Sequence, residues 1–344
     1  MLEFACLLHF ALTALTAWPG QGGALLTPDV NTHGFIGVMG FSYTMLLHFL
    51  VNSSRYGGKT TALRRLLALL SLLLAGGALL VSKFLLTITG TAFLLTSAAL
   101  FFYFTPTPNR REDLFLTWAV TISLLSWLYF VYALNFTHLW GFETRFSYIM
   151  LAFSFPISLL LFSRYVDFLQ ISPKHVKQTA LVLVGGVLSL FAGMLLVWPP
   201  LELASAGLLL LLIAWYMLQA HRLREPFLLS AFIGLLLTGL TGVWYLLAYI
   251  MGHGQETKVM LSLHAHLAHF SWAIFGIYYL LLRDNGDQHR NLLPALAPLL
   301  TSLLLLAVYL LTEHPWLPAA AVILFLVSGL APARALVKAR QHRN

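Results

Sequence analysis

Three histidines stand close together at the start of one long apolar run, LSLHAHLAHFSWAIFGIYYLLL, which covers residues 261–282. An α-helix turns by about 100° per residue, so His264 and His266 point to opposite faces. His266 and His269 are i,i+3 neighbours and share one face. A buried imidazole needs partners for its ring nitrogens, and a metal ion or haem iron can serve one of them. The spacing therefore predicts one ligand for each of two neighbouring sites.

A second apolar run carries a histidine at its own beginning, in NTHGFIGVMGF. His33 is followed by Gly34, Gly37 and Gly40, a row that lets a helix or a flat macrocycle approach the backbone closely. If both runs begin at the same membrane face, His33 and His266 lie at similar depth. Two imidazoles on facing helices at one depth are the arrangement that bis-histidine haem coordination requires.

The elements that must position these histidines are membrane-spanning helices. Apolar residues make up 59% of the 344 residues and charged residues only 9%, whereas soluble domains average roughly 25% charge. The mean hydropathy is +0.83. The apolar runs are about 20 residues long without strict alternation, which favours helices over barrel strands. We expect an all-α integral membrane protein that forms a single membrane domain over residues 1–344.

Twelve spans are predicted, joined by short connectors rich in proline and glycine. They cover residues 2–18, 33–52, 64–82, 84–104, 114–134, 146–166, 178–198, 201–220, 227–250, 259–282, 292–312 and 317–336. The first run lacks a basic segment and contains Glu3, so it is interpreted as a span and not as a cleaved signal.

The distribution of basic residues predicts the orientation. With both termini inside, the inner loops and the C-terminal tail hold every lysine and arginine except Lys83, Arg145 and Lys258. This asymmetry follows the positive-inside rule and accounts for the formal charge of +8 without a nucleic-acid partner. It also places His33, His264, His266 and His269 near the outer face. We expect a multi-pass protein of a bacterial inner membrane.

The single cysteine, Cys6, excludes an internal disulfide, an iron–sulfur centre and a cysteine-rich zinc site. Structural alternatives remain for the histidines. His33, His264 and His266 could bond between helices, and His269 could bind a metal or a haem propionate or serve packing alone. His9 and His48 lie in other spans, where a structural role is the default.

Twelve spans, a histidine at the outer end of the second and a His-x-His at the outer end of the tenth resemble subunit I of the haem–copper oxidases. The resemblance implies an oxidase-like helix bundle, with His33 and His266 as ligands of a low-spin haem b. It implies that His264 binds a second haem or a copper ion. The NnrS family of nitric-oxide-response membrane proteins is similar in span count and binds haem and copper.

The sequence departs from the oxidase pattern at the copper site. The predicted spans 146–166 and 178–198 contain no histidine, so the copper-site histidines are missing. We therefore expect electron transfer or a respiratory role involving nitric oxide or O₂, without a complete oxygen-reducing centre. Catalytic turnover as an oxidoreductase component stays open. Expected partners are lipid, a cytochrome or another respiratory subunit, and a diatomic gas or quinol.

Two other classes of function fit the same pattern. A twelve-helix secondary transporter is one, although it should carry broken helices or polar groups at mid-membrane. A structural or assembly subunit of a respiratory membrane complex is the other.

Overall fold

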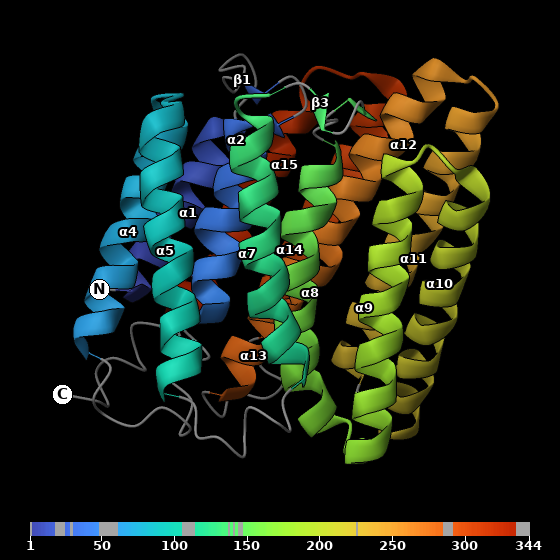
Figure 1. The fold of residues 1–344 in the computed structure, drawn as a ribbon, viewed down its shortest axis with the longest axis horizontal. Coiled ribbons are helices and arrows are strands. Elements are labelled where there is room, and N and C mark those ends of the chain that lie inside the picture. Colours follow the sequence, from blue (N-terminus) through green and yellow to red (C-terminus); the bar gives the residue numbers. More distant parts are fainter. Residues whose placement is uncertain are drawn as a thin grey trace. The chain divides into compact units, whose positions relative to one another are not determined.

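The structure is a computed structural model and is built almost entirely of helices (Figure 1). It describes residues 2–17, 25–27, 30–47, 61–104, 114–136, 138–139, 142–143, 147–224, 226–284 and 292–334. The internal contacts divide the chain into two units, Met1–Ser163 and Arg164–Asn344. The boundary between them falls within one helix. The prediction of a single membrane domain stays a prediction.

Unit 1 contains helices joined by connectors that include two short antiparallel hairpins, β1–β2 and β3–β4. Its elements are α1 (Leu2–Thr16), β1 (Leu25–Thr27), β2 (Val30–Asn31), α2 (Thr32–Phe35), η1 (Ile36–Tyr43), α4 (Thr61–Leu79), α5 (Lys83–Phe104), α7 (Leu114–Ala133), β3 (His138–Leu139), β4 (Phe142–Glu143) and the first part of α8 (Ser147–Phe168). Helix α1 packs against η1 and α4, and α5 packs against α4 and α7.

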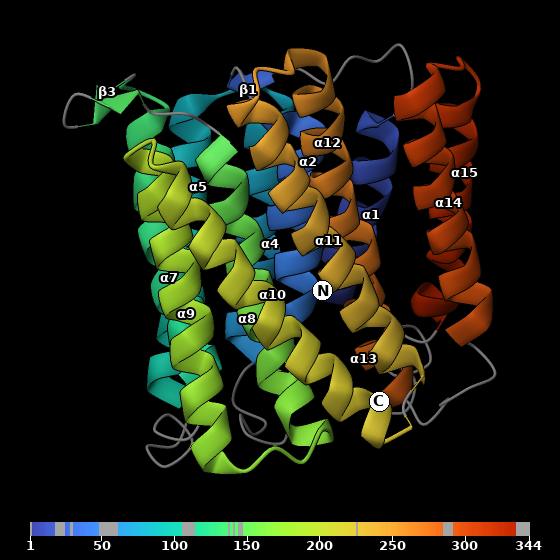
Figure 2. The same ribbon diagram turned by 90° about the vertical axis from the view of Figure 1, so that its right-hand side faces the viewer.

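Unit 2 contains the end of α8 and a series of helices in which sequence neighbours pack together (Figure 2). They are α9 (Pro173–Leu195), α10 (Pro199–Arg222), α11 (Pro226–Ile250), α12 (Gly254–His266), η3 (Leu267–Ile274), α13 (Phe275–Asp284), α14 (Leu292–Thr312) and α15 (Leu317–Ser328). Helix α11 contacts α12, η3 and α13, and α14 contacts α12, α13, η3 and α15.

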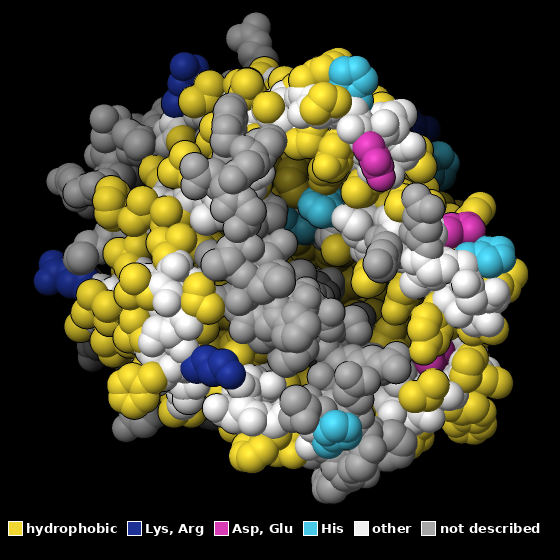
Figure 3. Space-filling view, turned by 90° about the horizontal axis from the view of Figure 1, so that it is seen from above, with side chains coloured by type: hydrophobic (Ala, Val, Ile, Leu, Met, Phe, Trp, Pro, Cys, Tyr) yellow, Lys and Arg dark blue, Asp and Glu magenta, His cyan; other side chains and the backbone are white. Residues whose placement is uncertain are grey.

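Each of the twelve predicted spans contains helix, and eight helices within the described residues are long and apolar enough to cross a membrane. Two shorter apolar helices, Phe4–Thr16 and Ile36–Leu47, lie in the first two predicted spans. Hydrophobic side chains prevail among the described residues on the face drawn in Figure 3, and acidic side chains are few there. The chain is thus a helical, multi-pass membrane protein; the position of its termini and an oxidase-like bundle stay predictions.

Several helices end in the same backbone turn, in which one residue takes a positive φ. Val81 (φ 52°) donates its N–H to Ala78 O, and the next residue, Ser82, donates to Gly77 O. Val197 (φ 53°) and Trp198 repeat this pattern with Met194 and Gly193. This is the Schellman motif, which satisfies the last carbonyls of a helix and turns the chain back. It lets consecutive spans follow one another with very short connectors.

Two spans change from α- to π-helix part-way through, which hydropathy alone did not predict. The span that begins with His33 becomes π-helical at Ile36–Tyr43, and the span that begins with α12 becomes π-helical at Leu267–Ile274. π-Helical segments are rare and occur frequently at functional sites. η1 begins three residues after His33, and η3 begins directly after His266 and contains His269.

Candidate functional site

His264 lies in the last turn of α12 and points at α11. Its Nδ1 is 2.8 Å from the backbone oxygen of Thr238. A carbonyl oxygen can only accept, so Nδ1 must carry the proton and Nε2 keeps its lone pair. The side chain is half-buried. The bond to a neighbouring helix fixes both the direction of the ring and its tautomer.

A row of small residues on α11 makes this approach possible. Gly234, Thr238 and Gly242 recur every four residues, so they share one face of α11. A Cβ added at Gly242 would lie 3.0 Å from Cε1 of His264, and one added at Gly234 would lie 2.5 Å from the backbone oxygen of Ser271 in η3. We call these three residues the α11 seam. Small residues at such positions let membrane helices approach closely.

His266 points in another direction, as the two-residue spacing predicts. Its Nδ1 is 2.7 Å from the backbone oxygen of Ser262 on its own helix, and its ring lies 6.1 Å from that of Phe270. Phe270 in turn packs on Phe325 of α15. The same tautomer argument applies, so Nε2 of His266 is also the nitrogen with an available lone pair. This side chain is half-buried too.

His269 lies inside η3 and shares the Phe270 side with His266, because its ring is 5.9 Å from that of Phe270. That these two residues share a face stays a prediction.

The predicted partner of His266 belongs to the other unit. His33 lies in α2, where the backbone is helical, and its side chain lies outside the described residues. Because α2 belongs to unit 1 and α12 to unit 2, the pairing of His33 with His266 stays a prediction. His48 also lies outside the described residues.

The glycine row after His33 was expected to admit a helix or a flat macrocycle, and at Gly40 a helix, α1, lies against it. At Gly40 the space of a missing Cβ is taken by the imidazole of His9, whose Nδ1 would be 2.8 Å from that atom. His9 is fully buried, and neither ring nitrogen has a hydrogen-bond partner. The hydroxyls of Ser42 and Thr44 are buried in the same condition.

These polar groups in unit 1 were missed because His9 looks like an isolated histidine in an apolar run. The α11 seam was also missed, although its glycine and threonine spacing in GLLLTGLTG is visible in the sequence. Small residues four apart in a membrane span are a known sign of close helix packing.

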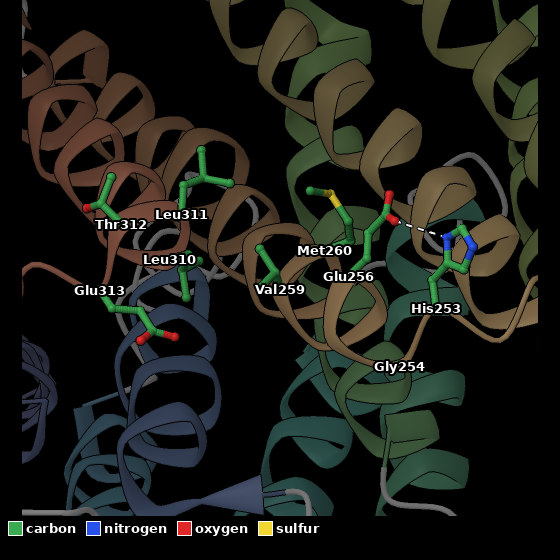
Figure 4. Close-up of a pocket in the computed structure, with 9 residues that line it drawn as sticks. All are labelled: His253, Gly254, Glu256, Val259, Met260, Leu310, Leu311, Thr312 and Glu313. Carbon is green, nitrogen blue, oxygen red and sulfur yellow. Dashed lines mark hydrogen bonds and ion pairs between the residues drawn. The ribbon is translucent and has the colours of Figure 1, made fainter.

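An open groove of about 750 Å³ lies beside the start of α12 and the end of α14 (Figure 4). Its walls include Val259, Met260 and Leu311, and its polar lining includes Glu256 and Glu313. Glu256 accepts hydrogen bonds from Trp244 Nε1 (2.6 Å) and His253 Nδ1 (3.2 Å). These bonds, the one from Trp244 above all, hold the pKa of Glu256 below its ordinary value. Its carboxylate therefore stays charged at neutral pH.

The described residues contain no group of three or more His, Cys, Asp or Glu side chains placed to hold one metal ion. The donors of unit 2 are instead single imidazoles on separate faces, His264 on one and His266 with His269 on the other. Such donors suit a cofactor that needs one axial ligand from each helix.

Comparisons with known proteins add no relative. No family model, no curated protein sequence and no solved structure matches the chain.

Proposed function

We propose that this membrane protein binds haem and uses it in electron transfer or in handling a diatomic gas. His266 would supply one axial ligand through Nε2, and His33 would supply the other. The observation that carries the proposal is the anchoring of the histidine rings in α12. Nδ1 of His264 and Nδ1 of His266 each lie within 2.8 Å of a backbone oxygen.

This anchoring is what an iron ligand requires. Histidines that bind metals almost always donate the other ring N–H to a carboxylate, carbonyl or water, which fixes the tautomer and raises the basicity of the ligating nitrogen. Two anchored imidazoles two residues apart, on different faces, support two separate positions for cofactors.

The second position is that of His264. The resemblance to oxidase subunit I implies a second haem or a copper ion there, and His269 could add a ligand or bind a propionate. The Nε2 lone pair of His264 is the donor that either would use. Because the spans 146–166 and 178–198 lack histidine, a copper-site triad is not part of this proposal. When bound, haem would supply reversible one-electron chemistry and an iron able to bind nitric oxide or O₂.

The surroundings fit a respiratory role. The helices are apolar enough for a lipid bilayer, and haem between spans would carry electrons within it. A quinol, a cytochrome or another respiratory subunit of a bacterial inner membrane would then be the source or the acceptor of electrons. The distribution of basic residues in the sequence supports the predicted orientation.

A reduced-minus-oxidised absorbance spectrum of the purified protein from haem-replete cells tests the proposal. We expect a low-spin b-type band that is lost in His266→Ala and in His33→Ala. The matched control is His175→Ala. His175 lies in the first turn of α9, and it is also anchored, because its Nδ1 is 2.9 Å from Ser172 Oγ. A wild-type protein with a featureless spectrum would overturn the proposal.

The same measurement addresses the second position. His264→Ala should keep the low-spin band and lose any high-spin feature or bound copper, as measured by metal analysis. Loss of the low-spin band in His264→Ala but not in His266→Ala would reverse the assignment of the two residues.

The two π-helical segments give little support to the alternative that this protein is a transporter. Transporter sites use unwound segments whose free backbone groups bind the substrate. In contrast, η1 and η3 are continuous with helix on both sides, since the residues that flank them keep right-handed helical torsion angles.

A further inference from the structure

His9 is a polar side chain that the haem proposal does not use. It is fully buried in α1, and among the residues that the structure describes neither Nδ1 nor Nε2 has a hydrogen-bond partner. A neutral imidazole has one donor and one acceptor nitrogen. Leaving either one unpaired in an apolar interior costs about 1–3 kcal/mol. An unpaired buried imidazole therefore requires a physical explanation.

Thr44 is unusual in the same way. In other helices of the described chain, buried threonines bond back to the carbonyl four residues earlier: Thr13 to His9 O at 2.8 Å, Thr89 to Leu85 O at 2.7 Å and Thr238 to Gly234 O at 2.9 Å. The hydroxyl of Thr44 is fully buried and has no partner. Its usual local acceptor is therefore not in use.

The two groups lie on the same helix contact. The ring of His9 packs on Gly40, and Phe10 packs on Phe41 with ring centroids 5.3 Å apart, so this face of α1 covers η1. Thr44 follows Gly40 by four residues, which is close to one helical turn. One turn advances about 5 Å along the axis, and two hydrogen bonds through one water span roughly 5.5 Å. This spacing along η1 is the one that a single bridging water between the imidazole at Gly40 and the hydroxyl of Thr44 would need.

We propose that His9 and Thr44 bind an internal water at the α1–η1 contact. The water accepts from or donates to one ring nitrogen of His9 and bonds to Thr44 Oγ1. Buried waters characteristically satisfy such otherwise unpaired polar groups. A metal ion fits less well, because a metal-bound histidine normally donates its second N–H to a carbonyl, and His9 has no such bond. The site gives the interior of unit 1 an ionisable group in contact with water.

Water-edited solid-state ¹⁵N NMR tests this on the full chain in proteoliposomes, with uniform ¹⁵N labelling. Signals of His9 are identified by their loss in His9→Leu. We expect its ring nitrogens to receive polarisation from water at least about twofold faster than the buried backbone of α4. Thr44→Val should abolish that advantage, and Thr44→Ser should keep it. Thr89→Val is the matched control, because that hydroxyl already bonds within its own helix.

Three outcomes would overturn the proposal. The His9 signals could build up as slowly as those of the buried backbone, which would mean that no water is bound there. The rapid growth could persist in Thr44→Val, which means that Thr44 does not hold the water. Added Cu⁺ or Zn²⁺ could replace the rapid signal with a large ring-nitrogen shift, which assigns the site to a metal. None of these readouts depends on haem, so the water site is tested independently of the proposed function.

Discussion

The histidines at the two π-helical spans, His264 and His9, differ in how their ring nitrogens are satisfied. Near η3 in unit 2, His264 bonds to Thr238 O and Ser271 bonds to Leu267 O. At η1 in unit 1, His9 and Thr44 are fully buried without partners. A bonded imidazole has a fixed tautomer and presents one nitrogen to a ligand, whereas an unbonded one still needs a small partner. The comparison separates an imidazole anchored to a neighbouring helix from a buried imidazole that has no hydrogen-bond partner among the described residues.

The difference comes from what each histidine meets on the opposite helix. His264 lies over Gly242 and also reaches a carbonyl, because the α11 seam brings the two backbones together. His9 lies over Gly40, and its ring nitrogens bond to no carbonyl among the described residues. A glycine makes room for a ring but offers no side chain to bond. The neighbouring carbonyl, not the glycine, decides whether the imidazole is anchored.

The largest expected effect tests the α11 seam. In Gly234→Ala the new Cβ would lie 2.5 Å from the backbone oxygen of Ser271, so α11 and η3 must separate. We expect the free energy of unfolding in detergent to fall by about 2–3 kcal/mol. Gly40→Ala should cost less, about 1 kcal/mol, because its new Cβ meets the side chain of His9, which can move more easily than a backbone.

The control for both changes is Gly207→Ala in α10, where nothing lies within 4 Å of the new Cβ. It should stabilise the protein by about 0.5–1 kcal/mol, because alanine is the better helix former. An equal loss of stability in Gly234→Ala and Gly40→Ala would show that the two helix contacts are equally rigid. That result would contradict the expected difference between the two units.

Much of the fold could be predicted from apolar run length, since a bilayer demands about 20 residues of helix per span. The divergence of His264 and His266 also followed from helix geometry alone. The π-segments could not be predicted, because α- and π-helices both satisfy the backbone and need the same apolar residues. The burial of His9 could not be predicted either. A histidine in an apolar run has the same sequence signature whether it faces lipid or another helix.

The next prediction concerns coupling between side chains. If water links His9 to Thr44, each single change, His9→Leu or Thr44→Val, leaves the other group unpaired. The double variant removes both groups and should be less destabilised than the sum by about 1 kcal/mol. This is measured from thermal or denaturant unfolding of the four proteins.

The matched pair in unit 2 is His264→Leu with Thr238→Val. His264 bonds to the backbone of Thr238, which the valine keeps, so the coupling should be about 0.5 kcal/mol or less. Coupling as large in this pair as in the unit 1 pair would contradict the distinction between anchored and unanchored imidazoles.

A smaller change in stability is expected at the Schellman turns, and it should be the same in both units. Val81 in unit 1 and Val197 in unit 2 adopt φ of 52° and 53° in their Schellman turns, a conformation that costs a β-branched residue about 1–2 kcal/mol. Glycine relieves this strain but loses more entropy on folding, so Val81→Gly and Val197→Gly should each stabilise by about 0.5 kcal/mol. Gly252→Ala, at φ 75°, should destabilise. A gain in one unit alone would show that the turns, too, differ between units.

The smallest effect concerns the entrance to α12, where acidification should disturb the hydrogen bonds of Glu256. The pKa of Glu256 is lowered from 4.5 by its bonds to Trp244 and His253. Its contribution to stability is therefore complete above the ordinary pKa and is lost as the pH falls through it to the lowered value. Trp244 fluorescence, obtained by difference from Trp244→Phe, should shift in that window. Glu256→Gln should remove the shift because it no longer titrates. A shift that persists in Glu256→Gln would show that the carboxylate is not the group that holds Trp244.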